Sequence, residues 1–151
     1  MLNLSSEFGK SRKNISSNLP FLNNSAGSLS IAFAVAITNT ADSFSAIQVS
    51  KLAKTLSGAT VHGLKRRTKD ADETFDDTVA HLRDLFIAER PIIGVCAAGI
   101  LIRALAPLIS DKHKEPPVLA LSEDGNTIIP LLGGHHGANR LAQELAAKLG
   151  I

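Results

Sequence analysis

The distribution of apolar and polar residues divides the chain into a polar start and a longer region of alternating strands and helices. Residues 1–30 contain eight Ser and five Asn and few apolar residues. Such a composition cannot bury enough surface to offset the entropy lost on ordering, so we expect a flexible leader at 1–30. We place the folded domain at residues 31–151.

The first half of this domain alternates between apolar runs and an amphipathic segment. The run that begins at Ile31 is short, continuous and apolar, as a strand buried on both faces requires. Residues 59–64 indicate a second strand, and the charged stretch 65–77 is interpreted as turns. Between the two strands, four apolar residues at near-helical spacing predict a helix that ends at Gly58: Phe44, Ile47, Leu52 and Leu56.

The middle of the domain predicts a helix followed by a strand, a turn and a second helix. Residues 91–98 form another continuous apolar run, and a short helix opens at Gly99. The helix before this strand ends ahead of Pro91 and carries an apolar stripe: Val79, Leu82, Leu85 and Phe86.

The last part of the domain predicts a hairpin and a terminal helix. Residues 118–122 and 127–132 are short strands joined by the turn sequence Glu-Asp-Gly-Asn, which favours an antiparallel hairpin. An amphipathic helix follows over residues 138–149. The whole pattern predicts an α/β fold with three layers, in which a mostly parallel open sheet with an antiparallel hairpin is flanked by helices. An α/β sheet would use the next residues as a further strand, so we expect the domain to be cut from a longer chain.

Composition and charge narrow the choice of partners. Residues 1–30 carry the whole formal net charge of +2, and the rest has thirteen Lys and Arg against thirteen Asp and Glu, with six Phe and no Tyr or Trp in the chain. This composition does not favour a nucleic-acid partner. No apolar run approaches a membrane span of about 20 residues. The single cysteine, Cys96, lies in an apolar run and is expected to be buried, which suits a cytoplasmic location.

Two glycine-containing loops follow predicted strands and lead into predicted helices, at residues 97–99 and 133–139. In open α/β sheets such loops face a common crevice at the carboxyl ends of the strands, where ligands bind. Helix N-termini attract anions, and glycine lets a ligand approach the backbone. Gly133, Gly134 and Gly137 could simply form a tight turn, but the histidines among them favour a site.

The side chains near these loops suggest a site for an anion. His135 and His136 could be metal ligands, an acid–base pair or hydrogen-bond donors; a metal is not expected, because only His113 and Glu115 could assist them. Arg103 interrupts an apolar helix face, so it either faces a ligand or extends to solvent. Together with Lys112 it would line a cationic crevice suited to a polycarboxylate or a phosphate.

Several linked motifs in the stretch from residue 99 to 149 resemble the amino-terminal region of the CbiG family of cobalamin biosynthesis. The order and spacing of these motifs match the family pattern. The matching residues are Ala98-Gly99-Ile100 with Arg103, Ala106-Pro107-Leu108, Asp111-Lys112, Pro116, Val118, Gly125, Leu131-Leu132, Gly134-His135 and Gly137-Ala138-Asn139. The resemblance implies a cobalt-precorrin or precorrin tetrapyrrole as ligand, whose carboxylates suit the cationic crevice. It also implies the site roles: His135 contacts the substrate or transfers a proton, and the remaining residues bind it, namely Gly99, Arg103, Lys112, Gly133, Gly134, His136, Gly137 and Asn139.

Three departures from the family pattern change what the resemblance implies about activity. Gly133 stands where the family has Ser, one Gly is missing beside Gly137, and Glu115 replaces an Asp. Such loops look like those of CbiG-type domains fused ahead of a precorrin-3B C17-methyltransferase. We therefore expect the amino-terminal part of such a fusion, whose methyl transfer would lie in a following domain, and no cofactor in the present segment.

Three alternatives remain open. The chain could act as a cobalt-precorrin-5A hydrolase, which opens a ring-A lactone, or as a non-catalytic scaffold for a methyltransferase of the corrin pathway. Generic nucleotide binding is disfavoured, because the chain has neither a P-loop nor a Gly-x-Gly-x-x-Gly motif.

Overall fold

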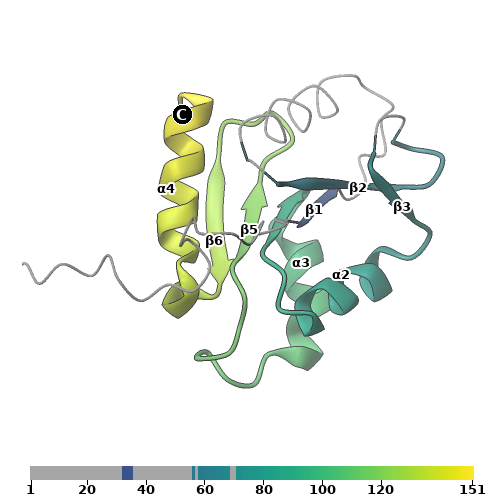
Figure 1. The fold of residues 1–151 in the computed structure, drawn as a ribbon, viewed down its shortest axis with the longest axis horizontal. Coiled ribbons are helices and arrows are strands. Elements are labelled where there is room, and N and C mark those ends of the chain that lie inside the picture. The colour runs from purple at the N-terminus through teal and green to yellow at the C-terminus, as the bar shows by residue number, and fades with distance from the viewer. Residues whose placement is uncertain (1–31, 36–55, 57, 69–70) are drawn as a thin grey trace, which may run out of the picture.

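The fold is built on one six-stranded sheet with the strand order β3-β2-β1-β4-β5-β6 (Figure 1). The computed structural model describes residues 32–35, 56, 58–68 and 71–151. The expected leader and nearly all of the helix predicted before Gly58 lie outside the described residues. The strands are β1 (Ala32–Val35), β2 (Thr60–Leu64), β3 (Glu73–Phe75), β4 (Ile92–Val95), β5 (Val118–Leu121) and β6 (Ile128–Leu132).

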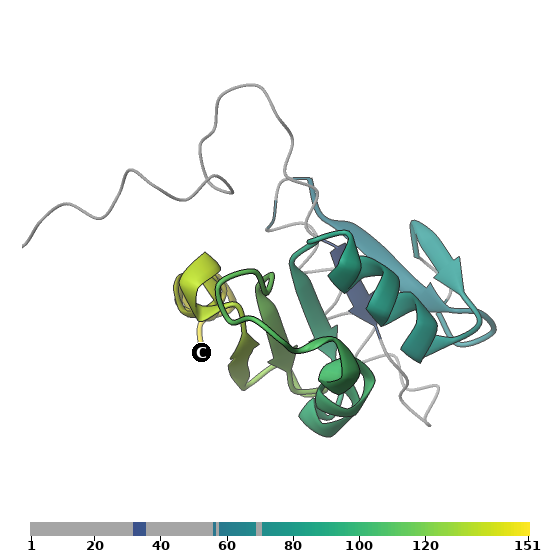
Figure 2. The same ribbon diagram turned by 90° about the horizontal axis from the view of Figure 1, so that it is seen from below.

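Helices cover both faces of the sheet and form two outer layers. On one face lie α2 (Thr78–Ile87) and α3 (Ala98–Leu105), which continues into the short helix η1 (Ala106–Leu108). On the other face lies α4 (Ala138–Leu149), which is preceded by the short helix η2 (Gly134–His136). Figures 1 and 2 show α4 on the opposite side of the sheet from α2 and α3. The predicted three-layer α/β architecture is confirmed.

The core is divided by the sheet into two apolar clusters, because successive side chains of a strand point to opposite faces. Ile93 and Val95 of β4 pack in the cluster under α4, whereas Ile92 packs in the cluster under α2 and α3. The central strands β4 and β5 are buried at every position, as their continuous apolar sequences predict.

Five strands run parallel, and the sixth reverses direction. β1 to β5 pair with parallel neighbours, while β6 pairs antiparallel to β5, with Leu121 opposite Ile128 and Val118 opposite Leu132. The connecting turn has Gly125 at φ 70°, and Asp124 accepts a hydrogen bond from the backbone N–H of Asn126. The predicted antiparallel hairpin is therefore confirmed.

The charged stretch 65–77, interpreted from the sequence as turns, contains the short strand β3. The backbone N–H of Val61 donates to the Asp72 carboxylate at 2.8 Å, and the N–H of Lys65 donates to the Phe75 carbonyl at 2.8 Å. These bonds hold β3 parallel to β2 at the edge of the sheet. A strand of three residues with one buried side chain has too little apolar pattern to be recognised from the sequence.

Cys96 lies directly after β4 and is buried, as expected. Burial raises the pKa of its thiol to about 11, and nearby Glu123 acts in the same direction. The thiol is therefore protonated near neutral pH, which makes Cys96 a packing residue and a poor nucleophile. Among the helices of the described residues, none is both long enough and apolar enough to cross a membrane.

A partly buried pair of histidines joins α2 to the sheet. His62 Nδ1 on β2 lies 2.9 Å from His81 Nε2 on α2, so one proton is shared in a hydrogen bond. The His81 ring also stacks on Phe75, with 4.5 Å between centroids, and Glu73 Oε2 lies 3.4 Å from His62 Nδ1. Burial lowers the pKa of both histidines below 6.5, and the opposing effect of Glu73 does not cancel it.

This pair predicts that the fold loses stability in mild acid. Unfolded histidines take up protons near pH 6.5 and the folded pair only at lower pH, so stability is complete above about pH 6.5 and declines as pH falls through the lowered folded values. We expect the urea-unfolding free energy to drop between about pH 7.5 and about pH 5, and to drop less in His81→Gln. The control variant, His113→Gln, alters an exposed ring, so its unfolding free energy should decline with pH as much as that of the unaltered chain. Equal declines in the unaltered chain and His81→Gln would contradict this assignment.

Candidate functional site

The reversal of β6 decides where the predicted site residues lie. Leu132 ends β6 opposite Val118, the first residue of β5, and Val118 pairs with Ile92, the first residue of β4. Loop 133–139 therefore starts at the edge formed by the amino ends of the parallel strands. Loop 97–99 follows β4 at the carboxyl edge. The prediction that these two loops share one crevice is wrong, because the rule behind it applies to loops that follow parallel strands.

Loop 133–139 packs instead against the segment that leads into β5, residues 109–117. His136 Nδ1 lies 2.8 Å from the carbonyl oxygen of Glu115, so the ring donates its Nδ1–H to that oxygen. Glu115 is itself buried. Figure 2 looks onto this edge from below and shows the segment that leads into β5 beside α4. Hydrogen bonding between the two loops fixes their relative position.

Gly133 has a backbone conformation that no other residue type fits well here. It lies in the left-handed region at φ 73°, and a Cβ built on it would come within 2.4 Å of the Pro116 carbonyl oxygen. Gly137 is also left-handed, at φ 91°, and precedes α4 without a side-chain cap. The tight-turn interpretation thus accounts for these two glycines. Gly134 differs, since its Cβ would meet nothing closer than Asn139 Nδ2 at 4.0 Å.

Two exposed imidazole rings meet where the two loops join. The centroids of His113 and His135 are 4.5 Å apart, with the ring planes tilted by 36°. Lys112, also exposed, is the neighbour of His113 in the same turn. The amino edge therefore collects most of the predicted site residues: Lys112, Gly133, Gly134, His135, His136, Gly137 and Asn139.

Arg103 and Gly99 lie away from this group. The Arg103 guanidinium folds back along α3 and donates to the Gly99 carbonyl oxygen at 3.3 Å, in an exposed position. Gly99 is in the first turn of α3, at the carboxyl edge of the sheet. The cationic crevice predicted from Arg103 together with Lys112 is therefore split between the two edges, because α3 turns the Arg103 side chain toward its own N-terminus.

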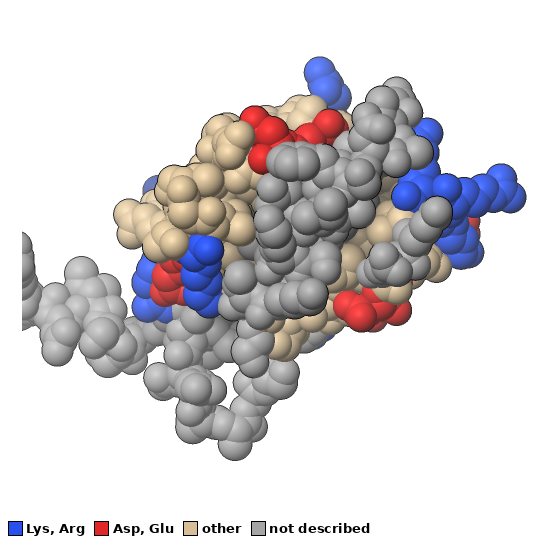
Figure 3. Space-filling view, turned by 90° about the horizontal axis from the view of Figure 1, so that it is seen from above, with Lys and Arg blue, Asp and Glu red and all other residues tan. Residues whose placement is uncertain are grey.

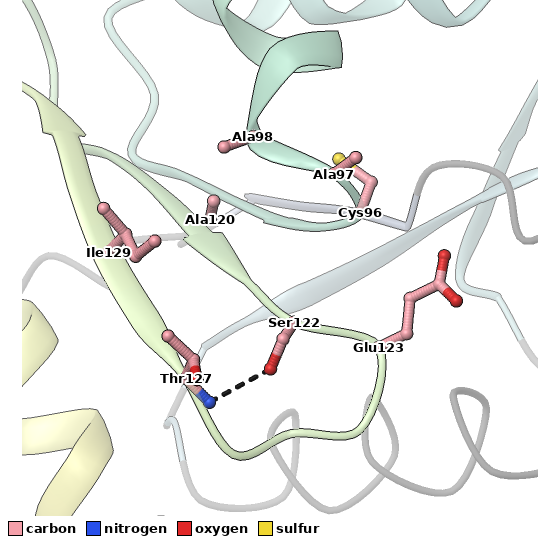
Figure 4. Close-up of a pocket in the computed structure, with 8 residues that line it drawn as sticks. All are labelled: Cys96, Ala97, Ala98, Ala120, Ser122, Glu123, Thr127 and Ile129. Carbon is pink, nitrogen blue, oxygen red and sulfur yellow. Dashed lines mark hydrogen bonds between the residues drawn. The ribbon is translucent and has the colours of Figure 1, made fainter.

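The carboxyl edge contains a hollow of about 320 Å³ that the sequence did not indicate (Figure 4). It lies between the start of α3 and the β5–β6 hairpin, and small side chains such as Ala97, Ala98 and Ala120 leave it open. Its charged lining residue is acidic, Glu123. Figure 3 looks onto this edge from above and shows both acidic and basic side chains around the grey residues. This hollow suits an apolar group better than an anion.

Metal ligands are sparse in the part of the chain that the structure describes. No group of three or more His, Cys, Asp or Glu side chains is placed there to hold an ion. Histidine pairs do occur, at His62 with His81 and at His113 with His135.

Comparison with known proteins relates the part of the chain that holds this site to a protein family. Residues 80–151 match the family described as "Cobalamin synthesis G N-terminal", the CbiG amino-terminal family. We refer to residues 80–151, the part of the chain that matches this family, as the CbiG region. The resemblance noted in the sequence is thereby confirmed, and the CbiG region includes α3, the hairpin and both loops of the amino edge.

Two curated proteins are similar to part of this chain. The cobalt-precorrin-5A hydrolase of Salmonella typhimurium is 44% identical over 69 residues, which cover 45% of this chain and 20% of that protein. The cobalt-precorrin-5A hydrolase of Priestia megaterium is 36% identical over 69 residues, or 45% of this chain and 18% of that protein. The chain thus spans at most a fifth of the length of these curated relatives.

A solved structure shares the fold beyond the CbiG region. A cobalamin biosynthesis protein G homolog from Sulfolobus solfataricus superimposes with a TM-score of 0.59 and 25% identity, over 82% of this chain and 35% of that chain. The similarity covers 82% of this chain and therefore extends beyond residues 80–151.

The conformation of Gly133 gives a prediction with a control one residue away. Gly133→Ser introduces the residue of the family pattern but forces a side chain into the left-handed region and against the Pro116 backbone. We expect it to lower the unfolding free energy by about 2 kcal/mol or more, measured by urea unfolding. Gly134→Ser should cost less than about 1 kcal/mol, because its Cβ points into open space. Similar losses in both variants would show that the loop does not adopt this conformation.

Proposed function

We propose that the CbiG region binds an anionic tetrapyrrole of the precorrin type at the amino edge, between segments 111–117 and 133–139. The observation that carries the proposal is the meeting of the His113 and His135 rings beside Lys112. Tetrapyrroles of the corrin pathway combine a broad ring with acetate and propionate carboxylates. Exposed imidazole rings can contact the tetrapyrrole ring, and ammonium groups can bind its carboxylates.

The charges of the amino edge support an anionic ligand. Lys114 Nζ lies 3.6 Å from Asp111 Oδ2, so part of its charge is balanced within the loop. For Lys112 no ion pair with another described residue is found, which leaves its ammonium group available to a carboxylate. The N-terminus of α4 adds partial positive charge on the same edge and has no side-chain cap.

The relatives support a role in a hydrolase of the corrin pathway. Both curated relatives are cobalt-precorrin-5A hydrolases, and the family match includes the segment that forms the amino edge. We therefore propose that this region helps to hold the substrate of such an enzyme, with His135 contacting it or transferring a proton. The fused methyltransferase expected from the loop sequence stays a prediction, and methyl transfer would require a further domain.

A binding experiment can show which edge of the sheet binds the ligand. The ligand is uroporphyrin, a metal-free tetrapyrrole rich in acetate and propionate groups, whose fluorescence reports binding. We expect Lys112→Ala to weaken its affinity about tenfold, since one charge-assisted hydrogen bond is lost. Arg103→Ala removes the same charge at the opposite edge and should change the affinity by less than about twofold.

The salt dependence of binding adds a second readout. Affinity should fall as salt rises, because exposed charges are screened. It should fall less steeply for Lys112→Ala than for the unaltered chain. Binding that depends on Arg103 and not on Lys112 would place the ligand at the carboxyl edge and contradict the proposal.

A further inference from the structure

The exposed histidine pair at the amino edge has a chemistry that carboxylate binding does not use. His113 and His135 come from separate loops, yet their ring centroids lie only 4.5 Å apart. Both residues are exposed to solvent. Neutral imidazole is the commonest side-chain ligand of transition metals.

The described residues do not form a metal site by themselves, because two imidazoles without a third ligand are too few. A cobalt ion inside a tetrapyrrole needs fewer ligands from the protein. The pyrrole nitrogens already occupy the positions in the plane of the ring, and only an axial position is left for the protein. A single exposed imidazole is sufficient for such a position, as in haem proteins.

The two rings are held differently, which distinguishes their roles. His135 lies within η2, whose turn is closed by the His136 N–H donating to the Gly133 carbonyl oxygen at 2.9 Å. The contact of the His136 ring with the Glu115 carbonyl oxygen anchors that turn to the neighbouring loop. His113 lies in a turn in which its backbone N–H donates to Asp111 Oδ1 at 3.0 Å. The backbone of His135 is thus held by η2 and, through His136, by the neighbouring loop, and the His113 ring packs against the His135 ring.

We propose that His135 is the axial ligand to the cobalt of a bound cobalt tetrapyrrole, with His113 as the positioning residue that orients its ring. The inference rests on the proposed function and adds a preference for ligands that already contain cobalt. In the binding step a ring nitrogen of His135 donates its lone pair to cobalt, and a water molecule leaves the axial position. No electron is transferred, and the oxidation state of cobalt is unchanged.

The test compares one tetrapyrrole with and without its metal. Cobalt(III) uroporphyrin and metal-free uroporphyrin carry the same carboxylates. The cobalt form adds an axial position and one positive charge, and the His135→Gln variant separates these two effects. We expect the unaltered chain to bind the cobalt form about tenfold more tightly and to shift its visible absorption bands. His135→Gln should remove both the preference and the shift, so that the variant binds the cobalt form and the metal-free form with equal affinity, which is weaker than that of the unaltered chain because the ring contact is lost. His113→Gln should keep the shift and weaken the preference.

Electron paramagnetic resonance of the cobalt(II) form gives a signature that a purely structural role would not produce. An axial nitrogen splits the cobalt signal further, and this splitting should be present in the unaltered chain and absent in His135→Gln. Equal affinity for the two uroporphyrins without nitrogen splitting would overturn the inference and leave the proposed function intact. Splitting that survives His135→Gln but not His113→Gln would overturn the assignment of roles. Failure of both uroporphyrins to bind would overturn the proposed function as well.

Discussion

The antiparallel pairing of β5 with β6 is the constraint on which the rest of the site depends. A further parallel strand would have returned the chain to the carboxyl edge, where α/β proteins usually bind ligands. The hairpin instead ends at Leu132 beside Val118, so the following loop meets the segment that leads into β5. The location of His135 close to His113 follows from this one reversal of direction.

Backbone contacts then convert this proximity into a defined geometry. Gly133 adopts a left-handed conformation against the Pro116 carbonyl, and the His136 ring donates to the Glu115 carbonyl. Neither contact depends on an exposed charge, so both should persist at high salt. The exposed rings and Lys112 are consequently presented by a scaffold whose position is set by the backbone. The carboxyl edge differs in character, with small apolar side chains and Glu123 around its hollow.

The sequence predicted the parts of this structure that depend on local pattern. The apolar runs at β4 and β5, the turn at Gly125, the burial of Leu82 and Phe86 on α2 and the burial of Cys96 all depend on neighbours along the chain, whereas Val79 of the predicted α2 stripe is exposed. The missed features depend on distant contacts. β3 is recognisable only from its bonds to β2, and the His62–His81 pair only from the packing of α2 on the sheet. The same limit applies to the candidate site. The sequence motifs identified its loops, but the sequence placed Arg103 and Lys112 together, whereas the fold separates them.

Mapping of the bound ligand by amide hydrogen exchange tests the central claim most directly, that the hairpin creates a binding site at the amino edge. The exchange rates of the chain would be compared with and without saturating cobalt uroporphyrin. The account predicts slower exchange in residues 111–117 and 133–139, with little change in residues 96–103 and 122–127. Slower exchange confined to residues 96–103 and 122–127 would place the ligand at the carboxyl edge and contradict it.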